Sequence, residues 1–303
     1  MAVVGSAARR AAALLICGAA VVGLATASAP TRPTPAAPAA EAPPPAAAPS
    51  VDHARGPDPT AEMLRRPRGP FAVDQREVPA AEAEGFGDGT LHLPTDVDGA
   101  VGAVAISPGY GAQESAIAWM GPRLASFGFA VITLDTESLD DEPGARGRQL
   151  LAALDHLLAA EDLPVRIDAD RQAVIGHSMG GGGAMRAAAE RGRIDAVVPV
   201  APWHPRRGWS EVEAATLVIG AEQDRVAPVD EHALPILAGL TRARAAAYLE
   251  LRGADHLDPL DPDPTIAAHT VAWLKRHLDH DARYAPFVAP AEDDAAVSAW
   301  RRR

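Results

Sequence analysis

Ala173-Val174-Ile175-Gly176-His177-Ser178-Met179-Gly180-Gly181-Gly182-Gly183 is the stretch of this sequence that decides the fold. An apolar run leads into a Gly-x-Ser-x-Gly motif, and a helix-forming segment follows it. This order is typical of a nucleophile elbow, a sharp strand-to-helix turn that lifts a serine hydroxyl above the edge of a sheet. Each glycine in a helix costs about 1 kcal/mol relative to alanine, so four in a row indicate a need for close backbone packing. We therefore expect Ser178 to be a nucleophile.

Outward from the elbow, short β-rich runs alternate with helical segments. Strands are expected at residues 89–93, 101–107, 129–134, 173–176, 196–200, 216–220 and 246–251. Helices are expected at residues 115–127, 145–159, 179–190, 231–240 and 265–280. Short apolar strands that alternate with helices predict a mostly parallel sheet covered on both faces. Because no internal repeat is visible, the sequence favours one doubly wound α/β domain.

The composition excludes several classes of protein. Of the 303 residues, 48% are hydrophobic and 22% are charged, which argues against wholesale disorder and against a multi-span membrane protein. The formal charge of −12 argues against nucleic acid or an anionic membrane surface as the main partner. The single cysteine, Cys17, cannot form a disulfide within the chain.

The first fifty residues are expected to lie outside the fold. Arg9 and Arg10 precede an apolar run at 11–25, and small residues follow, which together predict a signal peptide over residues 1–29. The run is short of the roughly 20 residues that a spanning helix needs, which favours secretion over an uncleaved signal anchor. Residues 30–50 hold eight prolines and predict an extended linker. The catalytic domain is then expected over residues 51–303.

A serine nucleophile needs a base and a carboxylate that orients the base, in the chain order serine, acid, histidine. The expected strand 216–220 leads into a loop that carries Glu222, Asp224 and Asp230. Asp224 is the best candidate for the acid. Asp230 is expected to begin the next helix, where capping is the alternative role.

The base is expected after the last parallel strand, where His256 follows residues 246–251. His269 and His277 fit less well because they lie on an expected helix. His177, inside the elbow, is expected to shape the pocket. No pair of histidines has metal-ligand spacing with a third ligand, so neither a metal nor another cofactor is expected.

The oxyanion of a tetrahedral intermediate needs two backbone donors. One is expected from Met179, directly after the nucleophile, and the second from the loop after an earlier strand. That loop is Ser107-Pro108-Gly109-Tyr110-Gly111, so Tyr110 is expected to supply its N–H while its ring lines the acyl pocket. Trp203 is a second aromatic candidate for the pocket. Ordinary packing is the alternative role for both aromatic side chains.

With these residues in view, the chain resembles the actinobacterial cutinases and polyester hydrolases, including enzymes that degrade poly(ethylene terephthalate). The matching stretches span about residues 52–290 and include residues 55–60, 69–71, 106–110, 117–119, 176–183, 202–204, 218–221, 248–251 and 271–276. The resemblance implies an α/β-hydrolase fold without a lid and a secreted, extracellular serine ester hydrolase. Its implied substrate is an ester or polyester. We expect no nucleic-acid partner and no obligatory membrane partner, and we expect the protein to be a monomer.

Residue by residue, the resemblance supports Ser178, Asp224 and His256 as a triad and Tyr110 and Met179 as oxyanion donors. It also implies that Trp203 and Val226 contact the substrate.

The sequence departs from that family at several places. The expected mature chain has no cysteine for the C-terminal disulfide that these enzymes commonly carry. Gly111-Ala112-Gln113-Glu114 brings a carboxylate near the expected cleft, and Leu257 stands where an aromatic residue is common. Some relatives bind Ca²⁺ between acidic loops, and here Arg252 occupies one such position. We expect Arg252 to form an ion pair with Glu222 in place of that metal, and the alternative is that both side chains are simply solvated.

Two other functions remain open from the sequence. An acyltransferase would use the same acyl-enzyme and pass the acyl group to another alcohol. A catalytically silent binding module is the alternative from another class, although such a module would be expected to have lost a triad residue.

Overall fold

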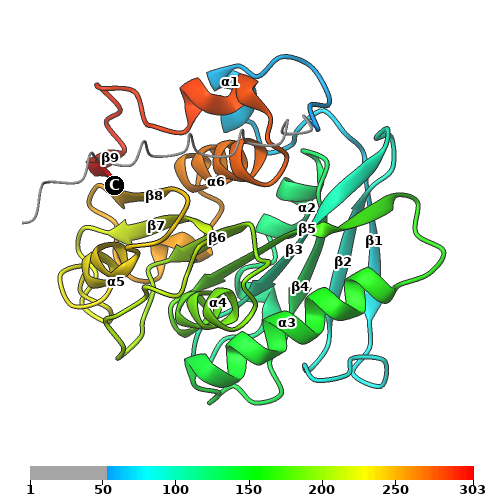
Figure 1. Ribbon diagram of the computed structural model, residues 1–303, viewed down its shortest axis with the longest axis horizontal. Coiled ribbons are helices and arrows are strands. Elements are labelled where there is room, and N and C mark those ends of the chain that lie inside the picture. Colours follow the sequence, from blue (N-terminus) through cyan, green and yellow to red (C-terminus); the bar gives the residue numbers. More distant parts are fainter. Residues whose placement is uncertain (1–52) are drawn as a thin grey trace, which may run out of the picture. The chain divides into compact units, whose positions relative to one another are not determined.

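The computed structural model describes residues 53–303, so the expected signal peptide and linker lie outside the described residues. The described residues build one nine-stranded sheet with the order β1-β2-β4-β3-β5-β6-β7-β8-β9 (Figure 1). The six central strands, from β4 to β8, pair in parallel, whereas β1, β2 and β9 pair antiparallel at the two edges. The strands are β1 Val73–Val78, β2 Gly89–Pro94, β3 Ala100–Ser107, β4 Ala130–Leu134, β5 Arg166–His177, β6 Ala196–Val200, β7 Ala215–Ala221, β8 Ala246–Leu251 and β9 Val297–Arg302.

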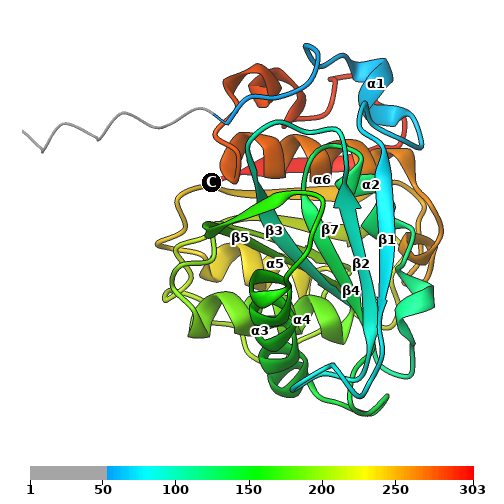
Figure 2. The same cartoon turned by 90° about the vertical axis from the view of Figure 1, so that its right-hand side faces the viewer.

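Helices cover both faces of the sheet. One layer holds α3 Pro143–Ala159, α4 Met179–Glu190 and α5 Ala233–Gly239, and the other holds α1 Ala61–Arg65, α2 Met120–Ala125 and α6 Pro264–His277 (Figures 1 and 2). Three short 3₁₀ helices complete the set: η1 Glu114–Ala116, η2 Asp258–Leu260 and η3 Ala282–Phe287. Within residues 53–303, no helix has both the length and the apolar character needed to cross a membrane.

The buried strands supply both layers because successive side chains point to opposite faces. In β3, Ala103 and Ala105 join the core under α3, α4 and α5, whereas Val104 and Ile106 join the core under α1, α2 and α6. Double burial explains why the central strands read as continuous apolar runs. The expected doubly wound, mostly parallel α/β-hydrolase fold is confirmed.

The differences from the predicted elements lie at the sheet edges, in one predicted helix and in three short helices, α1, η2 and η3, that were not predicted. All seven predicted strands are present, but β1 and β9 were not predicted. Four of the six residues of β1 are exposed, and β9 has one buried residue and ends in two exposed arginines. The prediction of one helix over 115–127 is wrong. The chain there forms η1, then a turn, and then the short helix α2.

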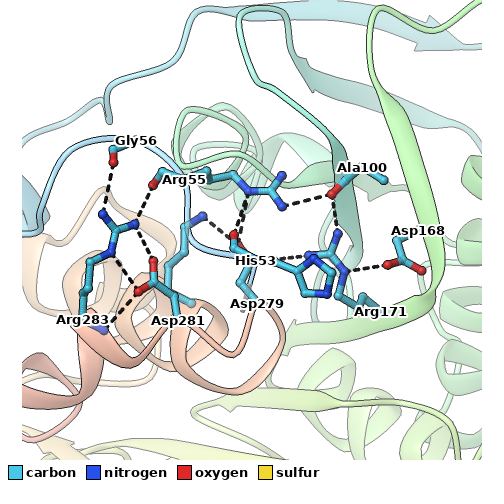
Figure 3. A network of polar contacts seen from close by, with 10 residues as sticks. His53, Arg55, Gly56, Ala100, Asp168, Arg171, Asp279, Asp281 and Arg283 are labelled. Carbon is cyan, nitrogen blue, oxygen red and sulfur yellow. Dashed lines mark hydrogen bonds and ion pairs between the residues drawn. The ribbon is translucent and has the colours of Figure 1, made fainter. Parts of the chain in front are cut away.

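A buried network of charges ties the start of the described chain and the segment at the end of α6 to the sheet (Figure 3). Lys275 on α6 and Arg171 on β5 both pair with Asp279, at 2.7 and 2.6 Å. Arg55 reaches the carbonyl of Ala100 on β3 and lies 3.9 Å from the same carboxylate. Because Lys275 and Asp279 are almost completely buried, their charges depend on each other.

Candidate active site

Ser178 occupies the turn between β5 and α4 with a left-handed backbone. Its φ is 54° and its ψ is −121°, a conformation that a non-glycine residue adopts only at a cost of about 1–3 kcal/mol. Strain of this kind is typical of a nucleophile elbow, in which the turn lifts the hydroxyl out of the sheet. The local geometry therefore agrees with the motif.

The glycines around Ser178 allow the backbone to pack at distances that no side chain permits. A Cβ atom on Gly180 would lie 2.4 Å or less from the carbonyl oxygens of Ser107 and Pro108. A Cβ atom on Gly182 would lie 2.2 Å from the carbonyl oxygen of Trp203. The glycines thus press the start of α4 against the loops that follow β3 and β6.

The structure brings three of the predicted residues together from three loops. His256 Nε2 lies 2.8 Å from Ser178 Oγ, and His256 Nδ1 lies 2.7 Å from Asp224 Oδ2. All three side chains are buried or nearly so. Of the alternatives, Asp230 and Glu222 have no contact with His256, and His269 and His277 lie on α6. The arrangement can pass a proton from a hydroxyl to an imidazole that a carboxylate orients.

Asp224 is held in its ionised form. Burial acts to raise the pKa of Asp224, but the hydrogen bonds from His256 and from the backbone N–H groups of Ala227 and Val226 outweigh it and keep this pKa below the usual value. The two backbone donors lie 2.7 and 2.9 Å from Oδ1. The charged carboxylate can therefore stabilise a positive imidazolium at His256.

His177 lies beside His256 and stays neutral. Burial, together with the neighbouring His256, lowers the pKa of His177 to about 4. Its Nε2–H donates to the carbonyl oxygen of His256 at 2.8 Å, so Nδ1 is unprotonated and has no hydrogen-bond partner. The centroids of the His177 and His256 rings are 4.9 Å apart. His177 thus supports the backbone of the histidine loop, and its expected part in the substrate pocket stays a prediction.

The loop that carries Tyr110 packs directly on the elbow. A Cβ atom on Gly109 would lie 2.9 Å from the Cβ atom of Ser178, which leaves Tyr110 at the edge of the site with 57% of its side chain exposed. The backbone N–H of Met179 belongs to the first turn of α4, where N–H groups have no partner inside the helix. Both predicted oxyanion donors therefore lie next to Ser178.

Arg146 on α3 holds this side of the site, and sequence reasoning missed it. Its side chain is completely buried and donates to the carbonyl oxygens of Pro108, Leu139 and Asp141, at 3.1, 2.8 and 2.7 Å. Burial lowers the pKa of Arg146. A buried cation with such partners is a positioning group for the loop of Tyr110 and for residues 139–141. Nothing in the local sequence distinguishes Arg146 from a solvated arginine on α3.

The comparisons with known proteins agree with this geometry. Residues 47–303 match the PET hydrolase-like family. The chain is 47% identical to a bis(hydroxyethyl) terephthalate hydrolase of Streptomyces coelicolor, over 81% of this chain and 79% of that protein. It is 47% identical to cutinase 1 of Thermobifida cellulosilytica, over 80% and 93%, and 44% identical to cutinase est1 of Thermobifida alba, over 81% and 83%.

The chain belongs to the PET hydrolase-like family. The resemblance found in the sequence is confirmed, and so is the expected enzyme class, a carboxylic ester hydrolase.

Exposed hydrophobic residues surround the site, and we call them the apolar rim. The large hydrophobic side chains that stand exposed among residues 53–303 are Tyr110, Leu139, Val226 and Leu257. Each lies on a loop at the carboxyl end of the strands, next to a residue of the site, and Gly111 donates to the carbonyl of Leu139 at 2.9 Å. Trp203, which is half-buried, donates its backbone N–H to the carbonyl of Ser178 and packs on His232. Leu139 was missed because it stands alone among acidic residues in the sequence.

The expected ion pair between Arg252 and Glu222 is wrong. Arg252 donates to the carbonyl oxygens of Ala295 and Val297, at 3.1 and 2.7 Å, and so braces the start of β9. Glu222 accepts the backbone N–H of Gly253 at 2.7 Å. The two side chains stabilise neighbouring segments separately. In the part of the chain that the structure describes, no cluster of three His, Cys, Asp or Glu side chains is arranged to hold a metal ion.

Proposed function

We propose that the protein is a secreted serine hydrolase that cleaves carboxylic esters, polyesters among them, through an acyl-enzyme on Ser178. The observation that carries this proposal is the continuous chain of hydrogen bonds from Ser178 Oγ through His256 to Asp224, at 2.8 and 2.7 Å. Membership of the PET hydrolase-like family supports the same class of reaction.

In the acylation step, His256 Nε2 takes the proton of Ser178 as Oγ attacks the ester carbonyl carbon. The carbonyl oxygen becomes an oxyanion, which the N–H groups of Tyr110 and Met179 stabilise. The imidazolium of His256 then gives its proton to the leaving alkoxide, the C–O bond breaks and an alcohol departs. Asp224 stays ionised and stabilises the positive charge on His256.

In the deacylation step, water takes the place of the alcohol. His256 removes a proton from the water, the hydroxide adds to the acyl carbonyl, and the collapse of this second intermediate returns the proton to Ser178. The product is a carboxylic acid and the free enzyme. An acyltransferase differs only in the acceptor, so product analysis separates the two functions.

The rim of the site favours apolar substrates. Tyr110, Leu139, Val226 and Leu257 expose large apolar side chains, with 43–61% of each accessible. A cluster of exposed hydrophobic residues around a buried nucleophile suits an apolar acyl chain or the surface of a polyester. The bis(hydroxyethyl) terephthalate hydrolase and cutinases among the relatives support an ester with an aromatic or aliphatic acyl group.

The route to the outside of the cell remains part of the proposal. We propose that residues 1–29 act as a signal peptide, residues 30–50 as a linker and residues 51–303 as the catalytic domain. Its action as an extracellular monomer, without a nucleic acid or membrane partner, belongs to the same proposal. Mass spectrometry of the secreted protein tests the cleavage site.

The function is tested with p-nitrophenyl esters of increasing acyl length and with an amorphous polyester film, on wild type and on the variant Ser178→Ala. We expect wild type to release acid and alcohol in equal amounts, and the variant to lose at least ~10³-fold in kcat while it keeps its fold. Ester cleavage by Ser178→Ala at the wild-type rate contradicts the mechanism. Transfer of the acyl group to added glycerol in place of water favours the acyltransferase.

A further inference from the structure

A pocket of about 460 Å³ lies between the segment that follows α1, the helix α2 and the start of α6. Figure 2 shows these three helices on the same side of the sheet. The pocket is lined by Arg65, Arg66, Pro67, Arg68, Trp119, Pro122, Arg123, Pro262, Asp263, Pro264 and Ala267. None of the residues proposed for catalysis lines it. The pocket is therefore separate from the proposed catalytic site.

The walls of the pocket combine flat apolar surfaces with an excess of positive charge. Trp119 and four prolines form the apolar part, and four arginines and one acid form the charged part. Asp263, the acid, already accepts the N–H groups of Thr265 and Ile266 as the N-cap of α6. Its remaining charge offsets only a fraction of the arginines. The lining of the pocket thus combines an excess of positive charge with apolar surface.

The arginines at the mouth differ in their partners. Arg65 pairs with Asp294, and Arg66 pairs with Glu62 on the exposed surface. Arg68 has no carboxylate partner among residues 53–303. Because surface ion pairs are weak, Arg66 and Arg68 are both available to a ligand.

Arg123 is the inner, buried arginine, and its charge is not balanced. The residue is 3% exposed, yet only Nη2 donates to a protein group, the carbonyl oxygen of Leu64. Nε and Nη1 are buried without a hydrogen-bond partner, and Arg123 has no carboxylate partner among the described residues. Burial lowers the pKa of Arg123 to about 10. A buried cation without a counter-charge is costly and calls for an anion.

Two further contacts of Arg123 bear on this reading. Its guanidinium lies 4.5 Å from the centre of the Phe127 ring, which offsets part of the charge but accepts neither free N–H. The hydroxyl of Thr270 is also buried without a partner and shares with Arg123 and Trp119 the narrow recess behind the pocket. Thr270 and Arg123 thus both line a narrow crevice and both carry buried polar atoms without a partner.

We propose that this pocket binds a small organic carboxylate with a flat apolar body, of the chemical class of an aromatic monocarboxylate. The carboxylate would pair with Arg66 and Arg68 at the mouth, and the uncompensated charge of Arg123 in the pocket wall would add to the attraction. The ring would lie against Trp119 and the prolines. This binding site is separate from the proposed catalytic site and requires no ester hydrolysis.

The test is calorimetric titration of the purified protein with benzoate and with benzamide, its uncharged counterpart. Benzoate is expected to bind saturably, with a dissociation constant on the order of 1 mM for a ligand of this size. Benzamide is expected to bind roughly tenfold more weakly or worse, because it carries no charge for the guanidinium groups. Equal binding of the two compounds, or no saturable binding of benzoate, overturns the proposal.

The variants locate the site. Arg66→Ala with Arg68→Ala is expected to weaken benzoate roughly tenfold, whereas Arg166→Ala, an exposed arginine outside the pocket, leaves it unchanged. Arg123→Lys keeps the charge and is expected to bind benzoate about as well as wild type, whereas Arg123→Met is expected to bind it more weakly. If Arg123→Met does not fold, the comparison of the double variant Arg66→Ala with Arg68→Ala against Arg166→Ala still tests the proposal. Benzoate binding that is equal in wild type, in Arg66→Ala with Arg68→Ala and in Arg166→Ala overturns the proposal.

Discussion

Replacing Asp279 by asparagine is expected to destabilise the domain strongly, and less so at high pH. The carboxylate pairs with Lys275 at 2.7 Å and with Arg171 at 2.6 Å, and its side chain has no exposed surface. Burial lowers the pKa of Lys275, and the negative charge of Asp279 is the main influence that opposes this. The substitution keeps the shape of the side chain, removes its charge and replaces one of its two acceptor oxygens by an amide NH2 group.

The size of the stability loss depends on whether Lys275 keeps its proton in the folded protein. Without the carboxylate, the least costly response of a fully buried ammonium is to lose its proton on folding. At pH 7 this costs at most about 1.36 × (10.4 − 7) ≈ 4.6 kcal/mol, in line with about 3–5 kcal/mol for a broken buried pair. At pH 9 the same limit is about 1.9 kcal/mol. The unfolded state holds the extra proton, so the stability of Asp279→Asn rises with pH.

The assay is urea unfolding of wild type and Asp279→Asn at pH 7 and pH 9. The control is Asp279→Asn combined with Lys275→Met, which removes the unpaired ammonium. Arg171 keeps a partner in Asp168 at 2.9 Å, so the control is expected to regain most of the lost stability. A loss below about 1 kcal/mol for Asp279→Asn, or equal losses at the two pH values, refutes the reasoning.

Three further predictions concern the proposed site and its loops. Asp224→Asn should lower kcat by about 10⁴ with little change in KM, because the amide favours the wrong tautomer of His256; steady-state kinetics check this, and wild-type kcat contradicts it. Arg146→Met should lower kcat by about 10² or more, because the loop that carries Tyr110 loses its hydrogen bonds to Arg146. Arg146→Lys should lower kcat less. An unchanged kcat in a folded Arg146→Met would show that Arg146 is not needed to position this loop. Millimolar Ca²⁺ should shift the melting temperature of wild type by less than about 2 °C, because Arg252 places a fixed cation beside the histidine loop; a large rise in a thermal scan contradicts this.

The core of the site could be predicted because its signals are local in the sequence. The elbow at Ser178 is encoded by neighbouring glycines between a strand and a helix. Asp224 and His256 follow from chain order, since parallel strands bring their carboxyl ends to one edge of the sheet. The central strands were also predicted from a local signal, because burial on both faces makes each of them a continuous apolar run.

The parts that sequence reasoning missed depend on contacts between distant segments. Arg146 lies on α3 and holds carbonyl groups of two loops, which no local pattern indicates. The edge strand β9 is rich in arginine, so its sequence does not read as a strand. The error about Arg252 follows from this omission, because the carbonyl oxygens around the start of β9 take up its guanidinium. Sheet edges and long-range polar contacts are thus where the prediction fails.

The central claim is that Ser178 is the nucleophile, and covalent trapping tests it most directly. The purified protein is titrated with a p-nitrophenyl phosphonate, and the modified residue is identified by tandem mass spectrometry after digestion. We predict one equivalent of p-nitrophenol, a single adduct on Ser178 and esterase activity that falls in proportion to the adduct. Complete inactivation with an unmodified Ser178, or an adduct on another residue, would contradict the account.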